Sequence, residues 1–208
     1  MNLKKFLPLI CIKFYTMNVL LFDNHDSFSW NLSHDLERAG ASVVVVRAEE
    51  LEIDIDKVLE PFDAIVLSPG PGMPSDAPGL MEVLASAVHL GKPILGVCLG
   101  LQAIVEFFGG ELENMNEVLH GRVGVLEIFE PCDIFENIYS GCEVGHYHSW
   151  CAVEATLPSD LSVIGRSKSK IVLAIAHKTK PIVGLQFHPE SILTTDGRLM
   201  LKNWVNSI

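Results

Sequence analysis

The 208-residue sequence predicts an α/β protein with an open, mixed and mainly parallel sheet that carries helices on both faces. Three observations lead to this prediction. In the first half of the chain, short apolar runs alternate with segments of helical spacing, which indicates a parallel sheet covered on both sides. A Gly-x-Cys-x-Gly turn at residues 96–100 joins one such run to one such segment. In the second half, strand-like runs follow one another without helices, which favours antiparallel strands at the edge of the sheet or in a flap beside it.

The first three expected strands are short and apolar. Residues 18–22 suit a strand buried on both faces, and the helix expected over 28–39 has apolar residues at helical spacing before Gly40 ends it. Residues 42–47 contain four consecutive valines and predict a second buried strand, and residues 63–68 predict a third. All of these elements belong to the parallel half.

The elements that follow complete the sheet. A helix is expected over 78–90, and the apolar run that ends at the Gly-x-Cys-x-Gly turn leads into a helix over 99–108. No internal repeat or linker divides the chain, so residues 17–208 are expected to form one domain. Further strands are expected at 123–129, 144–149, 162–167, 171–177 and 182–187, with a closing helix at 196–205.

The composition limits the classes of function. A hydrophobic content of 49% in 208 residues suits one globular domain with a substantial core. The formal net charge of -11 and the lack of a basic cluster argue against nucleic-acid binding. The five cysteines form no Cys-x-x-Cys pair and no metal spacing with histidine, so we expect free thiols in a reducing compartment, the cytoplasm. We therefore expect no metal, no cofactor and no membrane partner.

Residues 1–16 differ from the rest of the chain. Two lysines precede an apolar run at residues 6–12, which faintly resembles a signal peptide. However, Lys13 interrupts the run, no small-residue cleavage site follows, and the segment is too short to span a bilayer. Met17 stands directly before the first expected strand. We expect residues 1–16 to be a dispensable extension, for example from an upstream start codon, and a secretion signal is the alternative.

The Gly-x-Cys-x-Gly turn has the make-up of a nucleophile elbow, with a cysteine in the place of the serine of esterases. A nucleophile on a sharp strand-to-helix turn needs small neighbours, and Gly96 and Gly100 let the backbone pass without a Cβ clash. The thiol of Cys98 would then lie at a helix N-terminus, where unpaired N–H groups and the helix dipole favour a thiolate. For this pentapeptide alone, a buried cysteine in an ordinary βα unit is the alternative.

Further polar stretches lie where strands are expected to end. The loop over 68–74 holds three prolines and two glycines, and it should share one rim with Cys98 because ligands bind beyond the carboxyl ends of parallel strands. His188 and Glu190 are two residues apart, so they leave an extended backbone on the same side, as a base and its orienting carboxylate would. Residues 145–150 combine polar and aromatic groups that could line a pocket or cover a sheet face. A simple connector and a surface turn are the alternatives for the first two motifs taken singly.

Taken together, these stretches resemble the class I (triad-type) glutamine amidotransferases, whose fold is flavodoxin-like. The likeness is strongest to the glutaminase component of anthranilate synthase and of aminodeoxychorismate synthase. Five motifs carry it in the order of the family, and they cover essentially residues 17–208. The motifs are FDNHDSF at 22–28, SPGPG at 68–72, GVCLGLQ at 96–102, YHS at 147–149 and GLQFHPES at 184–191.

The resemblance implies a glutaminase mechanism. Cys98 matches the nucleophile that forms a γ-glutamyl thioester and releases ammonia, His188 matches the base and general acid, and Glu190 matches the orienting carboxylate. The ammonia would pass to a chorismate-binding synthase component I, in tryptophan synthesis, folate synthesis or both. The positions that match an oxyanion hole are the backbone of Gly70, Pro71, Gly72 and Leu99. Gln102 and the main chain of Ser149 and Trp150 match the positions that hold the backbone end of glutamine.

Two positions depart from the pattern of the family. Leu101 stands where histidine is frequent, and His146 stands where arginine is frequent. Neither change removes a member of the triad, so both bear on the identity of the partner more than on the chemistry. The surface expected to face the partner is the rim above the cysteine, built from residues 23–28, 70–74 and 146–150.

Three other functions stay open at this point. The chain could serve another ammonia acceptor, such as a guanylate or carbamoyl-phosphate synthesis partner. It could be a stand-alone γ-glutamyl hydrolase that needs no partner. A non-catalytic module with the same fold would predict a broken triad, whereas all three residue types are present.

Overall fold

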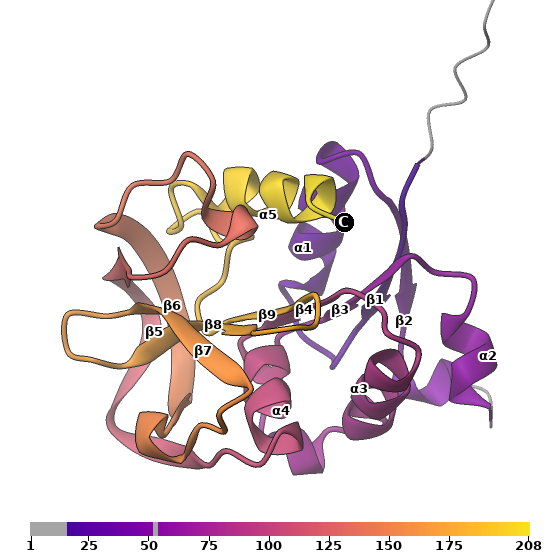
Figure 1. Ribbon diagram of the computed structural model, residues 1–208, viewed down its shortest axis with the longest axis horizontal. Coiled ribbons are helices and arrows are strands. Elements are labelled where there is room, and N and C mark those ends of the chain that lie inside the picture. Colours follow the sequence, from indigo (N-terminus) through magenta and orange to yellow (C-terminus); the bar gives the residue numbers. More distant parts are fainter. Residues whose placement is uncertain (1–15, 52–53) are drawn as a thin grey trace, which may run out of the picture.

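The computed structural model describes residues 16–51 and 54–208. These residues form a nine-stranded sheet with the strand order β2-β1-β3-β4-β9-β8-β7-β5-β6 (Figure 1). Five neighbouring strands are parallel, which is the pattern that alternating strands and helices predict. They are β1 (Asn18–Phe22), β2 (Ser42–Val46), β3 (Ala64–Leu67), β4 (Ile94–Val97) and β9 (Ile182–Leu185).

The second half of the chain extends the same sheet with antiparallel strands. β8 pairs antiparallel with β9, β7 with β8, and β5 with both β7 and β6. Of the two alternatives drawn from the sequence, the structure therefore has antiparallel strands at the edge of the sheet. These strands are β5 (Leu112–Ile128), β6 (Cys142–Ala152), β7 (Leu161–Arg166) and β8 (Val172–His177).

Helices cover both faces of the sheet, as predicted (Figure 1). The core on one face contains apolar side chains of α1 (Ser29–Arg38) and α5 (Gly197–Asn206). The core on the other face contains those of α3 (Leu80–His89) and α4 (Leu99–Phe107), with α2 (Ile55–Leu59) beside them. Single 3-10 turns lie at Ala48–Glu50, Pro74–Asp76, Asp133–Phe135 and Glu154–Thr156.

Two expectations about the strands are wrong. β2 is not buried, because it lies at the edge of the sheet with one neighbour, and Val44 is 48% exposed. β5 begins at Leu112 rather than near residue 123, because a long hairpin with β6 takes up residues that carry too many polar side chains to look like a strand. The short helix α2 had no counterpart among the expected elements.

The expected extension over residues 1–16 lies outside the described residues apart from Thr16. Within the described ranges, none of the helices has both the length and the apolar character needed to cross a membrane. Cys98, Cys132, Cys142 and Cys151, the cysteines that the structure describes, are free thiols, as expected.

Candidate active site

Cys98 lies at the turn between β4 and α4, at the carboxyl end of a parallel strand. Its backbone has φ 52° and ψ -98°, which non-glycine residues rarely adopt, so the turn is strained. A Cβ at Gly96 would come within 2.5 Å of the backbone of Gly100, and a Cβ at Gly100 would collide with the carbonyl of Leu67 in β3. The structure therefore contains the predicted elbow, with a cysteine at its tip and with both glycines required by close packing.

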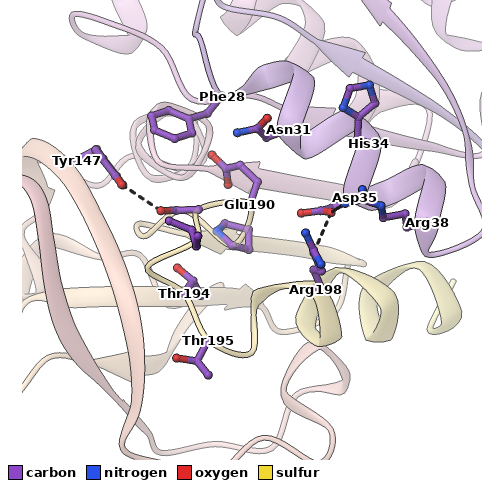
Figure 2. Close-up of a pocket in the computed structure, with 13 residues that line it drawn as sticks. Phe28, Asn31, His34, Asp35, Arg38, Tyr147, Glu190, Thr194, Thr195 and Arg198 are labelled. Atoms are coloured by element: carbon purple, nitrogen blue, oxygen red, sulfur yellow. Dashed lines mark hydrogen bonds and ion pairs between the residues drawn. The ribbon is translucent and has the colours of Figure 1, made fainter.

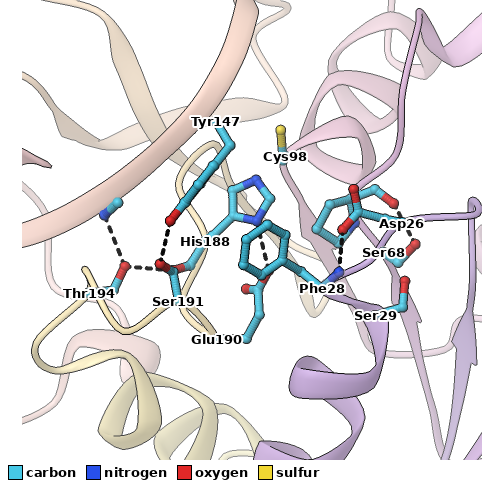
Figure 3. A network of polar contacts seen from close by, with 12 residues as sticks. Asp26, Phe28, Ser29, Ser68, Cys98, Tyr147, His188, Glu190, Ser191 and Thr194 are labelled. Atoms are coloured by element: carbon cyan, nitrogen blue, oxygen red, sulfur yellow. Dashed lines mark hydrogen bonds and ion pairs between the residues drawn. The ribbon is translucent and has the colours of Figure 1, made fainter. Parts of the chain in front are cut away.

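The strand beside β4 brings a histidine to this cysteine. β9 is parallel to β4, and the N–H of Cys98 donates to the carbonyl of Leu185 at the end of β9 at 2.7 Å. His188 follows three residues later and thus lies at the same edge of the sheet (Figure 3). Gln186 lies between Leu185 and His188 in the sequence. Its side chain is buried, and its Nε2 donates to the Sγ of Cys98 at 3.6 Å.

His188 and Glu190 form a buried pair. Nδ1 of His188 lies 2.7 Å from Oε1 of Glu190, and the two side chains are 3% and 0% exposed. A carboxylate oxygen accepts, so Nδ1 carries the proton and Nε2 is left on the side of Cys98 (Figure 3). Burial opposes the charged imidazolium, but the interactions with Cys98 and Glu190 outweigh it and raise the pKa of His188. The pair is therefore arranged to hold a proton next to the thiol.

Three buried side-chain atoms of the described residues have no hydrogen-bond partner, and two of them belong to this pair. They are Nε2 of His188 and Oε2 of Glu190, and the third is Oδ1 of Asn24. Buried polar atoms are normally paired, so unpaired ones gathered in one place are typical of a site that receives another molecule. Nε2 of His188 is the atom that would exchange a proton with the thiol and with a substrate.

Two aromatic rings cover the imidazole. The rings of Phe28 and Tyr147 lie 5.3 Å and 4.9 Å from that of His188, and 4.9 Å from each other. The hydroxyl of Tyr147 lies 3.0 Å from the Oγ of Ser191, which ties the aromatic cluster to the loop after β9 (Figure 3). These rings hold the imidazole in place, whereas the sequence placed both residues only in the rim expected to face the partner. Both lie inside motifs on which the family resemblance rests, and their positions in those motifs were the available signal.

The loop after β3 lies against the same turn, as predicted. Ser68 fixes its start, because its Oγ accepts from the N–H of Asn24 at 2.9 Å and its carbonyl accepts from Nδ2 of Asn24 at 3.0 Å. A Cβ at Gly70 would come within 2.7 Å of Leu99 and closer still to Asn24, so this loop packs directly on the first residue of α4. Gly72 has a φ of +77°, which favours glycine. Pro71 and Gly72 are exposed.

Gln102 connects α4 to strand β6. Its Nε2 donates to the carbonyl of Trp150 at 3.1 Å and lies 3.4 Å from Oε1 of Gln186. Ser149 and Trp150 are half-buried in β6, whereas Gln102 is 3% exposed. The structure thus brings the expected glutamine-binding side chain to the expected backbone carbonyl. Gln186 was missed as a site residue, although it stands two positions before His188.

Parts of the expected partner-facing rim are buried, so that expectation needs correction. His146 and His148 are 3% and 4% exposed, because their side chains point into the protein from β6. Asp23 is 1% exposed and accepts hydrogen bonds from Ser29 and Arg47. Leu101 is fully buried, with its side chain packed on β9. Neither of the two departures from the family pattern therefore reaches a partner at the surface.

A cavity of about 740 Å³ adjoins the site behind Glu190 (Figure 2). It lies between α1, α5 and the loop after β9, and its lining includes Phe28, Tyr147 and Glu190 but not Cys98 or Gln102. Asp35 in this cavity is 7% exposed and is paired with Arg38 at 2.8 Å and Arg198 at 3.2 Å. The cavity therefore lies on the carboxylate side of the pair of His188 and Glu190, whereas a substrate of Cys98 would lie on the opposite side of the imidazole. Among the described residues there is no cluster of three histidine, cysteine or acidic side chains that could hold a metal ion.

An α/β sheet that carries a cysteine on a strand-to-helix turn, next to a buried histidine–carboxylate pair, has the make-up of enzymes that transfer acyl groups through a thiol. The family model for Glutamine amidotransferase class-I matches residues 20–208, and the chain belongs to this family.

Curated relatives and a solved structure are similar to this chain over most of its length. It is 39% identical over 189 residues to a multifunctional tryptophan biosynthesis protein from Pichia angusta, and the matched region covers 91% of this chain and 51% of that protein. It is 38% identical over 190 residues to the aminodeoxychorismate/anthranilate synthase component 2 of Bacillus subtilis, with coverage of 91% and 96%. The crystal structure of a Thermoplasma acidophilum protein that is named as a GMP synthase subunit has a TM-score of 0.82 and 25% identity, covering 92% of this chain and 94% of that one. The chain thus spans about half the length of the Pichia relative and nearly all of the Bacillus one.

Proposed function

We propose that this chain is a glutaminase subunit that hydrolyses glutamine to glutamate and supplies ammonia to a chorismate-utilising synthase subunit. The observation that carries the proposal is the strained elbow of Cys98 beside the buried pair of His188 and Glu190, 2.7 Å apart. A nucleophile, a base and an orienting carboxylate are the three groups that acyl transfer through a covalent intermediate needs.

In the first half of the reaction, the thiol proton of Cys98 passes to Nε2 of His188, and the sulfur attacks the side-chain amide carbon of glutamine. The carbonyl π electrons move to oxygen, and the tetrahedral intermediate collapses as the C–N bond breaks. His188 donates the proton from Nε2 to the departing nitrogen, so ammonia leaves and a γ-glutamyl thioester remains on Cys98. Glu190 keeps the imidazole in the orientation and tautomer that this transfer needs.

In the second half, water releases glutamate. His188, now neutral at Nε2, takes a proton from the attacking water, and the sulfur leaves as the thioester breaks. Charge develops on the carbonyl oxygen in both halves. The N–H of Leu99 at the start of α4, where a helix has no partner for it, and the backbone of the Gly70-Pro71-Gly72 loop are our candidates for an oxyanion hole.

Gln102, Ser149 and Trp150 are our candidates for holding the backbone end of glutamine. The carbonyl of Trp150 accepts from Gln102 at 3.1 Å, and the two groups lie on the chain of polar contacts that leads through Gln186 to Cys98. A carbonyl suits the α-ammonium of glutamine, and an amide N–H suits its carboxylate. Binding both groups would place the side-chain amide of glutamine at the sulfur.

The names of the relatives support a chorismate-utilising partner. The Bacillus subtilis relative is a component 2 of aminodeoxychorismate and anthranilate synthesis, and the Pichia angusta relative belongs to tryptophan biosynthesis. We propose that this chain works with a component I in one or both of these syntheses, in the cytoplasm, with glutamine as its substrate. We also propose that residues 17–208 form the amidotransferase domain, so removal of residues 1–16 should leave activity and melting temperature unchanged.

Reconstitution with a chorismate-utilising subunit tests this function. The purified chain, chorismate and the candidate subunit are combined, and glutamate and the aminated product are measured with glutamine and, separately, with ammonium. The proposal requires product from glutamine only when this chain is present, and product from ammonium in either case. Glutamate release that never yields an aminated product, or cleavage of other γ-glutamyl compounds without a partner, would instead identify a stand-alone hydrolase. Product formation only with a different synthetase would identify another ammonia acceptor.

A further inference from the structure

Strand β6 holds two buried histidines that the proposed reaction does not use. His146 and His148 are 3% and 4% exposed, and their rings meet edge to face with centroids 5.2 Å apart. Nδ1 of His146 lies 3.1 Å from Nε2 of His148. Nδ1 of His148 lies 2.9 Å from the carbonyl oxygen of Trp150. The two rings and this carbonyl therefore form a continuous row of hydrogen bonds.

The carbonyl at the end of the row determines where each proton lies. A carbonyl oxygen only accepts, so Nδ1 of His148 must carry its proton, and a neutral ring then leaves Nε2 as an acceptor. Nδ1 of His146 must therefore carry the proton that this acceptor receives. Burial is the main cause that lowers the pKa of both histidines to about 4. Repulsion by His188 adds to it at both rings, and repulsion by His146 and His120 adds to it at His148. Both rings are thus neutral at pH 7, each protonated at Nδ1.

The same carbonyl connects the row to the nucleophile. Trp150 also accepts from Nε2 of Gln102 at 3.1 Å, and this Nε2 lies 3.4 Å from Oε1 of Gln186. Nε2 of Gln186 donates to the Sγ of Cys98 at 3.6 Å. Gln102 and Gln186 are 3% and 0% exposed, so water does not interrupt the contacts between them. A change in the position of His146 can therefore alter the contact between Gln186 and the sulfur of Cys98.

We propose that His146 is a positioning residue that acts through His148 on the carbonyl of Trp150. Its role is to keep this carbonyl and Gln102 ready for the backbone end of glutamine, so the inference rests on the proposed function. Without the N–H of His146, Nε2 of His148 is left as a buried acceptor without a donor, and the ring is held at one end only. The ring can then rotate, which weakens the 2.9 Å hydrogen bond from its Nδ1 to the carbonyl of Trp150.

Strand β5 packs closely against the Nε2 side of the His146 ring. Gly124 lies diagonally opposite His146 in the β5–β6 pair, and a Cβ at Gly124 would collide with Nε2 of His146. A glycine at this position therefore leaves just enough room for the ring. The row is thus fixed at one end by the backbone of β5 and at the other by the carbonyl of Trp150.

The protonation pattern can be tested without any activity. Long-range ¹H–¹⁵N correlation spectra of the uniformly labelled chain at pH 7 distinguish protonated from unprotonated ring nitrogens. We expect His146 and His148 both to be protonated at Nδ1 only, and the signal of the His148 Nδ1–H to shift in His146→Leu as its hydrogen bond to Trp150 weakens. A His148 protonated at Nε2, or an unchanged signal of the His148 Nδ1–H in this variant, would overturn the proposal. A failure of the proposed glutaminase function would leave these spectra unaffected, so the two failures can be told apart.

The consequence for the substrate is tested in the complex with the chorismate-utilising subunit. His146→Leu should raise KM for glutamine about tenfold with kcat changed by less than about twofold, because the thiol and its base are untouched. His146→Asn keeps an N–H near the position of Nδ1 and should return KM to within about threefold of the original value. His89→Leu, on the exposed end of α3, is the matched control and should change neither constant. An unchanged KM in His146→Leu, or no rescue by asparagine, would overturn the proposal.

A second variant covers the case in which His146→Leu does not fold. Gly124→Ala removes no polar group of the row and displaces only the ring of His146, so it should also raise KM for glutamine. In a His146→Ala background the same substitution should add less than about twofold, because the smaller side chain leaves room for the new methyl group. Additive effects of the two substitutions would contradict a steric contact between these positions and overturn the proposed row.

Discussion

Among the residues that the structure describes, buried histidines occur in two regions, and their environments shift the pKa of the imidazole in opposite directions. In the loop after β9, His188 contacts a carboxylate and a thiol, and its pKa is raised. In β6, His146 and His148 contact each other and a carbonyl, and their pKa values are lowered to about 4. The two regions are close enough for His188 to add to the repulsion at both β6 histidines.

The comparison teaches that burial alone does not decide the charge of a histidine. All three rings are less than 5% exposed, and desolvation disfavours the imidazolium in each. What differs is the partner, since an anionic neighbour compensates for desolvation and a neutral acceptor does not. One region is therefore suited to moving a proton and the other to holding neutral groups in place.

Removing the thiol should have the largest effect. Cys98→Ala should lower glutamine-dependent synthesis by the complex by several orders of magnitude, because triad members act as a unit, and leave ammonia-dependent synthesis intact. It should also lower the pKa of His188, which loses one partner, and leave His146 and His148 unchanged. Enzyme assays and an NMR titration of the histidines measure both. Retained glutamine-dependent turnover would contradict the nucleophile assignment.

Removing the charge of the carboxylate should have the next largest effect. Glu190→Gln keeps the size of the side chain but presents an amide to Nδ1 of His188, so kcat should fall by roughly 10²- to 10⁴-fold as the imidazole loses its tautomer. Glu82→Gln, on the exposed face of α3, is the matched control. A kcat within threefold of the original value in Glu190→Gln would show that the pair at 2.7 Å does not orient the base.

Docking of the partner should act on a different part of the site. The pair of His188 and Glu190 is already assembled in the isolated chain, whereas Pro71 and Gly72 are exposed. If docking orients a backbone N–H of this loop toward the oxyanion, glutaminase turnover should rise about 10²- to 10³-fold. Glutamate release with and without the partner and chorismate measures this. Equal rates would show that the loop is already in its active arrangement.

The last predicted effect is on stability, and it has opposite signs in the two regions. The β6 histidines have a folded-state pKa below the unfolded value, so their contribution is present above pH 6.5 and is lost as the pH falls toward 4, by about 3 kcal/mol each. His188 has a raised pKa, so its contribution is present below pH 6.5 and is lost as the pH rises through the folded-state value.

Urea unfolding between pH 7 and 5 checks the acid side of this prediction. Carboxylates also lose stability in acid, so the informative quantity is the difference between the original chain and His146→Asn. The variant has one fewer histidine with a lowered pKa, and its stability should therefore fall less steeply over this range. The same pH dependence of the unfolding free energy in both proteins would contradict a lowered pKa of His146, and with it the difference between the two regions.

The sequence was a good guide where the cause of a structure is local. Gly96 and Gly100 predict a tight elbow because each must accept a close backbone, and the packing at both positions confirms this. The apolar runs likewise predicted the strands of the parallel half. The burial of β2 was predicted wrongly, because four valines suit any strand and the sequence does not tell which strand lies at the edge. The start of β5 was missed for a similar reason, since its pairing with β6 comes from a distant segment.

The site was predictable to the extent that its residues belong to motifs. His188 and Glu190 were expected to lie together because they are two residues apart, and they do. Gln186 was passed over because its contact with Cys98 spans 88 positions of sequence. The direction of His146 was also out of reach, because a histidine in place of a cation gives no sign of whether it faces solvent or a neighbouring ring.

The close packing of three glycines has a consequence for how this chain tolerates mutation. Besides the two glycines of the elbow, Gly197 at the start of α5 leaves no room for a Cβ beside the carbonyl of Pro189. In a saturation mutagenesis library, these positions should be as intolerant as Cys98, but for a different reason. Substitutions at the glycines should deplete the amount of folded protein in the cell, whereas substitutions at Cys98 should leave abundance near normal and remove growth that depends on glutamine as the nitrogen donor. Scoring abundance and growth in the same library would separate residues that build the site from the one that reacts.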